Sequence, residues 1–113
     1  MDSSPHPTQR LDDVVHQRVR LGILTVVHEA RRAEFGHLRE ALSLTGGNLS
    51  QHLRVLEEEG LIRIEKGSVG RRPRTWVAIT RKGRSALLQE VAALKAIVES
   101  VGKHRDDEQD GDG

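Results

Sequence analysis

The chain has 113 residues, a formal net charge of +1, and a composition that is 35% hydrophobic but only 2% aromatic. This length predicts one domain, whose modest core has to be built from aliphatic side chains. The absence of cysteine excludes disulfides, thiolate nucleophiles and cysteine metal sites, and the absence of any long apolar run or apolar signal segment predicts a cytoplasmic protein without a membrane partner.

Both ends of the chain are predicted to be disordered tails. Residues 1–10 hold two prolines among polar side chains, and residues 102–113 are charged and glycine-containing, with no apolar residue and five acids after Arg105. Such segments cannot bury enough apolar surface to fold. We therefore expect a single folded domain at residues 11–101.

The first helix is predicted from Leu11 to about Ala30. It begins beside two aspartates, which favour a helix N-terminus, and its apolar residues recur around most of the circumference. A helix with so wide an apolar surface is expected to be covered on more than one side, for instance by a second subunit. Val15 and Val19 are accordingly assigned to a dimer interface.

Two short helices are predicted next. The first spans about Gly36 to Ser43, and Phe35 leads into it as a very short strand. The second begins after Thr45, which is a suitable N-cap, and runs to Glu59, where Gly60 provides a stop. Two short helices joined by a tight turn predict a helix-turn-helix unit.

The helix that begins after Thr45 is predicted to have two distinct faces. At 3.6 residues per turn, its leucines at 49, 53 and 56 fall in one narrow sector and must face the core. The opposite side carries small and polar residues that can approach or bond base edges and phosphates. These are Gly47, Asn48, Ser50, Gln51 and Arg54. A merely solvated polar face is the alternative that this pattern leaves open.

A β-hairpin is predicted from the apolar residues at 61–64 and 76–79, with a glycine-containing tip between them. Residues 61–84 contain eight basic side chains and one acidic one, a net charge of +7. This concentration favours a polyanion, and arginines suit a narrow minor groove and its phosphates. The residues assigned to DNA are Lys66, Arg71, Arg72 and Arg74. A solvated basic turn is the alternative.

The last helix is predicted from Arg81 to Val101, with Thr80 as its cap. Its apolar positions step by four and three residues, which is the spacing of a coiled-coil seam. We expect this seam to be a dimer contact. Its members are Leu87, Val91, Leu94, Val98 and Val101. The predicted fold class is mainly α with a small β-hairpin (α+β), a winged helix-turn-helix with a long C-terminal dimerisation helix.

The blocks G-N-L-S-Q-H-L-R-V-L-E-E-E-G-L-I and G-R-R-P-R-T-W-V-A-I-T, in this order and at this spacing, resemble compact MarR- and ArsR-type winged-helix transcriptional regulators over about residues 11–100. The resemblance implies a homodimer paired through terminal helices that represses by covering promoter DNA, in the nucleoid. It also adds His52 to the recognition positions, although the helical wheel places this residue at the edge of the core. Gly46 departs from the family pattern, in which a polar or acidic residue is more usual.

Other functions are given less support by the sequence. No pair of histidines has helical metal-ligand spacing, and no phosphate loop or nucleophile elbow is present, so we expect no metal, no cofactor and no enzymatic activity. A metal site shared across a dimer by Glu99, His104 and Asp106 is left open. A small-molecule effector is unknown, and in so short a chain it would have to bind at the dimer interface. The alternative function is a protein-interaction module whose basic wing binds an acidic partner.

Overall fold

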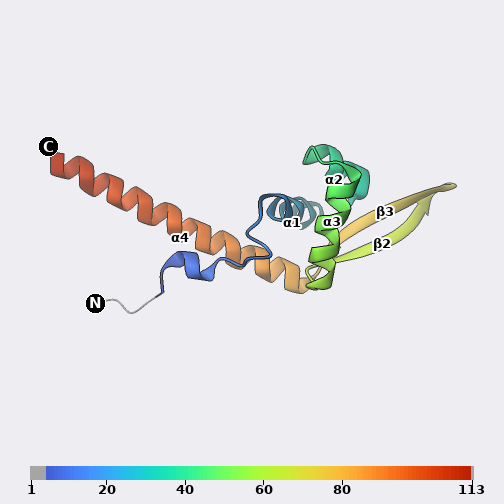
Figure 1. Cartoon of the computed structure of the whole chain (residues 1–113), viewed down its shortest axis with the longest axis horizontal. Coiled ribbons are helices and arrows are strands. Elements are labelled where there is room, and N and C mark those ends of the chain that lie inside the picture. The colour runs from blue at the N-terminus through green and yellow to red at the C-terminus, as the bar shows by residue number, and fades with distance from the viewer. Residues whose placement is uncertain (1–4, 113) are drawn as a thin grey trace.

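The computed structural model describes residues 5–112, with side chains described for residues 5–103. In this part of the chain four α-helices accompany a three-stranded antiparallel sheet, which confirms the predicted α+β winged-helix fold (Figure 1). The elements are η1 (Pro7–Arg10), α1 (Arg18–Ala30), β1 (Arg32–Glu34), α2 (Phe35–Ala41), α3 (Gly46–Glu58), β2 (Ile62–Val69), β3 (Arg72–Ile79) and α4 (Arg81–Asp112).

The helix-turn-helix unit consists of α2 and α3. The hydroxyl of Thr45 accepts a hydrogen bond from the backbone N–H of Asn48 at 3.1 Å, so the predicted N-cap of α3 is confirmed. Gly60 has a φ of +74°, a left-handed conformation that glycine adopts without strain, and it ends the helix as predicted. Helix α2 is shorter than expected at its C-terminal end, because Ser43 already turns the chain with a φ of +54°.

The sheet has the strand order β1-β3-β2, so β3 is the central strand. Its register pairs Ile64 with Val77 and Glu65 with Trp76. Because side chains alternate across a strand, Ile64 and Val77 share the face that packs on the core, whereas Glu65 and Trp76 share the outer face. The short strand expected near Phe35 exists and pairs residues 32–34 with 76–78.

The wing formed by β2 and β3 is longer than the sequence indicated. We expected residues 71–74 to form a loop at its tip, but β3 already begins at Arg72, and only Gly70 and Arg71 lie between the strands. Gly70 has a φ of +62°, which lets a two-residue turn reverse the chain. The strand pairing therefore assigns alternate residues of the basic segment to opposite faces of the wing.

Helix α1 begins at Arg18, seven residues later than predicted. The Asp12 carboxylate accepts hydrogen bonds from the N–H groups of Val14 and Val15 at 2.8 and 3.2 Å, which closes a turn and not a continuous helix. Gln17 is the actual N-cap, since its side chain accepts from the N–H of Arg20. Ahead of this segment, η1 packs along α4 in a region expected to be disordered (Figure 1).

Helix α4 starts where it was predicted to start, with the Thr80 hydroxyl accepting from the N–H of Gly83 at 2.9 Å. It does not end at Val101 but continues to Asp112, so the backbone of the segment expected to be a disordered tail is helical. No proline interrupts this segment, although its four aspartates and two glycines are poor helix formers. None of the helices described is both long and apolar enough to cross a membrane.

The start of α4 is attached to the end of α3. The hydroxyl of Thr80 donates to the carbonyl of Gly60 at 2.7 Å, and the ammonium of Lys82 donates to the carbonyl of Glu59 at 2.8 Å. The N–H of Thr80 also donates to the carbonyl of Leu61 at 3.1 Å. These bonds satisfy carbonyls that the C-terminus of α3 leaves without helical partners.

The core lies between α1, α3, the inner face of the sheet and the first turns of α4. Its fully buried large side chains include Ile23, Leu24, Leu49 and Leu56. Two residues assigned to the dimer interface belong to this core as well, since Val15 is 0% and Leu87 is 3% exposed. Their assignment is corrected, because a side chain already covered within the protomer has no surface to offer a partner.

Candidate nucleic-acid interface

Helix α3 presents the polar face that the sequence predicted. The side chains of Asn48, Ser50, Gln51 and Arg54 are exposed, and Gly47 is exposed beside them at the start of the helix. Three buried leucines on the opposite face hold the helix against the core. A helix held by one face and exposed on the other can enter a major groove, where amide and guanidinium groups can form bidentate contacts with purine edges.

His52 differs from its neighbours on α3. Its side chain is half-buried, and the pKa of the ring is lowered, first by burial and second by the nearby Arg20 guanidinium. The ring is therefore mainly neutral at neutral pH. A neutral imidazole is a weaker phosphate partner than a cation, so the assignment of His52 to DNA contact has only the family resemblance behind it.

A groove runs between α3 and the inner face of the wing. Ser50 and Arg54 line it from the helix, and Lys66 and Thr75 line it from paired positions of β2 and β3. The remaining lining residues are Phe35, Leu53, Glu57 and Ile64. The structure thus brings Arg54 and Lys66, which the sequence analysis assigned to DNA, to one groove. Thr75 was missed, because its contribution depends on strand register and not on residue type.

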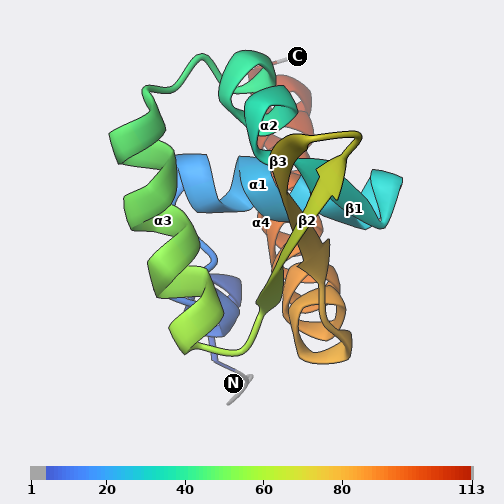
Figure 2. The ribbon, with the colours of Figure 1, turned by 90° about the vertical axis from the view of Figure 1, so that its right-hand side faces the viewer.

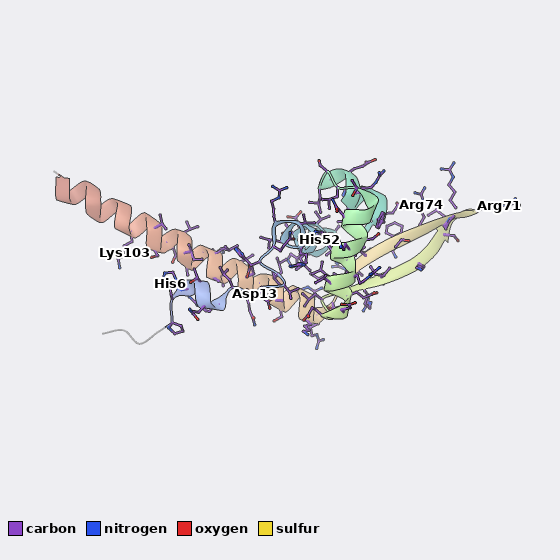
Figure 3. The ribbon with its side chains drawn as sticks, in the orientation of Figure 1. His6, Asp13, His52, Arg71, Arg74 and Lys103 are labelled. Carbon is purple, nitrogen blue, oxygen red and sulfur yellow. The ribbon has the colours of Figure 1, made fainter. Side chains whose placement is uncertain are left out.

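The wing arginines have different surroundings. Arg71 and Arg72 are exposed and make no ion pair among the described residues, whereas Arg74 donates to Glu34 Oε1 at 2.6 Å. Figure 3 shows Arg71 at the far end of the wing and Arg74 closer to its base. By strand alternation Arg72 and Arg74 lie on the outer face, opposite Lys66. The wing residues assigned to DNA are therefore divided between the two faces of the wing.

The wing stands beside α3 and extends beyond it (Figures 1 and 2). A basic tip next to an exposed helix offers contacts to two parts of a duplex, base edges from the helix and backbone from the tip. The chain matches the family model described as "Winged helix DNA-binding domain" over residues 19–98. The chain belongs to this family. Its members are DNA-binding transcriptional regulators and not enzymes.

The chain is similar in sequence to proteins from Methanocaldococcus jannaschii and Pyrococcus horikoshii. The chain is 38% identical over 83 residues to the uncharacterized protein MJ0432 of Methanocaldococcus jannaschii, which covers 74% of this chain and 90% of that protein. A transcriptional regulator homologue from Pyrococcus horikoshii is 35% identical, with a TM-score of 0.76 that covers 83% of this chain and 94% of the other.

The same fold occurs in regulators of the MarR and PadR type. A PadR-family regulator from Eggerthella lenta is 25% identical, with a TM-score of 0.60 over 72% of this chain and 78% of its own. The MOSR regulator of M. tuberculosis, solved in complex with DNA, is 20% identical, with a TM-score of 0.66 over 92% and 80% of the two chains. At this identity the MOSR likeness concerns the fold alone.

The predicted seam residues of this winged-helix protein are buried at the start of α4 and exposed toward its C-terminal end. The first of them, Leu87, lies in the core, Val91 and Leu94 are partly buried, and Val98 and Val101 are 69% and 64% exposed. Val19, on α1, is partly buried against the core. Leu88 was missed by the sequence analysis, since it falls outside the heptad spacing, but it is 53% exposed. Exposed aliphatic side chains of this size on a projecting helix favour contact with another apolar surface.

Proposed function

We propose that the protein is a homodimeric repressor that binds a pseudo-palindromic site in double-stranded DNA. Helix α3 enters the major groove, and the wing follows the adjacent backbone or minor groove. The observation that carries this proposal is the exposed face of α3, where the side chains of Asn48, Gln51 and Arg54 make no ion pair among the residues whose side chains are described. Arg54 also lines the groove that contains Lys66. Amide and guanidinium groups supply the base contacts, and cations supply the phosphate contacts.

The proposed dimer pairs two copies of α4. Val98 and Val101 continue a seam whose beginning is packed inside the protomer, and Leu94 and Val91 bridge the buried and exposed parts. A second copy would cover this stripe by the heptad packing that the spacing predicts. Two-fold pairing places two copies of α3 on one side of a duplex, which calls for half-sites about 10 base pairs apart, or a multiple of that.

The test is selection of bound duplexes from a random pool, followed by footprinting and affinity measurement at several salt concentrations. We expect an enriched sequence with two-fold symmetry, and an affinity whose logarithm falls linearly with the logarithm of salt concentration. Transcription in vitro from a promoter that contains the site should decrease. Failure to enrich any sequence, together with affinity for DNA no greater than for heparin, would overturn the proposal and favour a protein-interaction role for the basic wing.

A further inference from the structure

A second basic surface lies on the outer side of the sheet. A hollow there is lined by Arg31 at the end of α1, Arg32 on β1, Arg63 on β2 and Arg84 on α4. Four arginines from different elements thus line one hollow, and only Arg31 and Arg32 are neighbours in the sequence. The sequence analysis counted Arg63 and Arg84 with the wing charges and did not separate them from a DNA surface.

The positive charge of this hollow is only partly compensated. Glu65 is the one carboxylate that lines it, and its oxygens lie 3.5 Å from Arg32 and 3.4 Å from Arg63, which are long contacts for charged hydrogen bonds. Arg31 and Arg84 have no carboxylate partner within the residues for which side chains are described. Guanidinium groups held near one another repel, so an anion placed among them would be favoured.

His28 on α1 also lines the hollow. Its Nδ1 atom is buried and has no hydrogen-bond partner among the described residues, so this atom does not face the hollow as a ligand contact. Arg31 has a φ of +69°, a conformation that favours glycine, yet a long basic side chain occupies this position beside the hollow.

The hollow is separated from the proposed DNA surface by the sheet. Arg63 and Glu65 alternate along β2 with Ile62 and Ile64, whose side chains pack on the core, so the hollow and the groove beside α3 lie on opposite faces. Figure 2 shows α3 on one side of strands β2 and β3, and β1 on the other side of these two strands. A duplex seated on α3 would therefore leave these arginines free.

We propose that this hollow binds a small molecule that carries a multiply charged oxyanion, such as a phosphate ester or a polycarboxylate. Each guanidinium fork presents parallel N–H donors that match two oxygens of such a group. Arg63 and Arg84 bind the anion from β2 and α4. The Arg32 guanidinium lies 4.3 Å from the centre of the Trp76 ring, and this cation–π contact restrains its position.

The test uses Trp76, which is the only tryptophan of the chain and touches the hollow through Arg32. Its emission is followed while inorganic pyrophosphate or citrate is added at constant ionic strength, with sodium chloride as the reference salt. Calorimetric titration is run in parallel, because an anion that leaves the stack of Arg32 on Trp76 in place would not change the emission. We expect saturable binding of at least one of the two probes in at least one of these measurements.

The matched variants distinguish binding at this specific site from a general effect of positive charge on anion binding. Arg63→Gln and Arg84→Gln should each weaken probe binding by about tenfold or more, since each removes a charged hydrogen-bond donor. Arg39→Gln, an exposed arginine on α2 outside the hollow, should leave probe binding unchanged. Far-ultraviolet circular dichroism of each variant checks that it is folded, and Arg31→Gln gives an independent variant if either arginine variant is not.

Three results would overturn the inference. The first is the absence of binding beyond that of sodium chloride, and the second is an equal loss of probe binding in Arg39→Gln. The third is competition between pyrophosphate and a DNA duplex, with duplex affinity lost in Arg63→Gln and Arg84→Gln, which would assign the hollow to DNA. None of these results depends on the operator or on repression, so this inference and the proposed function can fail separately.

Discussion

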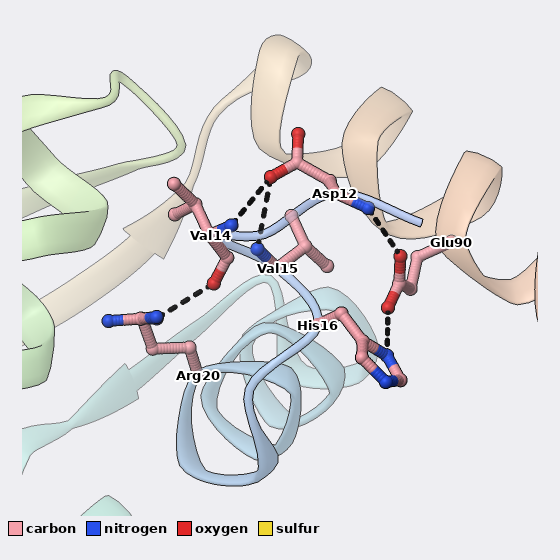
Figure 4. Close-up of polar contacts among 6 residues, drawn as sticks. All are labelled: Asp12, Val14, Val15, His16, Arg20 and Glu90. Carbon is pink, nitrogen blue, oxygen red and sulfur yellow. Dashed lines mark hydrogen bonds and ion pairs between the residues drawn. The ribbon is translucent and has the colours of Figure 1, made fainter. Parts of the chain in front are cut away.

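The Glu90 carboxylate on α4 lies 2.7 Å from Nδ1 of His16, although the two residues are 74 positions apart in the sequence. Its other oxygen accepts the backbone N–H of Asp12 at 3.2 Å (Figure 4). Glu90 is 1% exposed, whereas the His16 side chain is 50% exposed. A buried carboxylate with these partners joins the segment before α1 to α4.

We predict that Glu90→Ala lowers the free energy of unfolding by about 2 to 4 kcal/mol, because it leaves the Asp12 N–H and the His16 ring without a buried acceptor and opens a cavity. Glu90→Gln should cost less, since its amide oxygen can still accept one bond. Urea denaturation at fixed protein concentration measures both. Glu99→Ala, at an exposed site of the same helix, should change stability by about 0.5 kcal/mol or less. Equal losses at positions 90 and 99 would contradict this account.

Gly83→Ala is predicted to destabilise the fold by about 3 kcal/mol. A Cβ at this position would lie 2.0 Å from the carbonyl oxygen of Leu61, so α4 would have to move away from the start of β2. Thermal and urea unfolding provide the measurement. Gly102→Ala is the matched control on the same helix, where nothing lies within 4 Å, and it should be neutral or stabilising by up to about 1 kcal/mol. A neutral Gly83→Ala would show that the contact with β2 is not needed.

Gln51→Ala should relax the base preference at one position of the operator and cost about 1 to 3 kcal/mol on the preferred sequence, because a bidentate contact is lost there. Affinities for the selected duplex and for its single-base variants provide the measurement. Gln89→Ala, an exposed glutamine on α4, should leave all of these affinities unchanged. If Gln51→Ala weakens every duplex equally, the residue does not read a base.

Arg72→Ala and Arg74→Ala are predicted to act differently despite their similar positions on β3. Arg72 is exposed without an ion-pair partner among the described side chains, so its loss should weaken all duplexes alike and reduce the salt slope by about one. Arg74 is bound to Glu34, so its loss should mainly lower the melting temperature, by an amount that corresponds to about 1 kcal/mol or less. Anisotropy titrations and thermal unfolding together distinguish the two effects. The reverse pattern would show that the Glu34 pair opens on DNA.

Val98→Glu should convert the proposed dimer into a protomer of 12.6 kDa, because it puts a charge into the exposed part of the seam. Light scattering after size-exclusion chromatography measures the mass. Ser100→Glu lies about 200° further round α4 and serves as the control for added charge. A mass that is the same for the parent and Val98→Glu would mean that this seam does not hold two chains together.

The helix-turn-helix and the wing could be predicted because local signals agree there. Thr45, Gly60 and the leucine spacing each specify the same helix, and the glycines of the wing specify a turn. The start of α1 could not be predicted, because Asp12 favours a capping turn as readily as a helix start, and contact with Glu90 decides between them. The faces of Arg72 and Arg74 depend on strand register, which a one-residue shift reverses.

The bonds from Thr80 and Lys82 to the last carbonyls of α3 have a mechanical consequence. Because these bonds attach α3 to α4, we expect the two helices to move together as one rigid unit. In the proposed dimer, the crossing angle between the two copies of α4 would therefore set the distance between the two copies of α3. A change of a few degrees at the seam would alter which operator spacing fits.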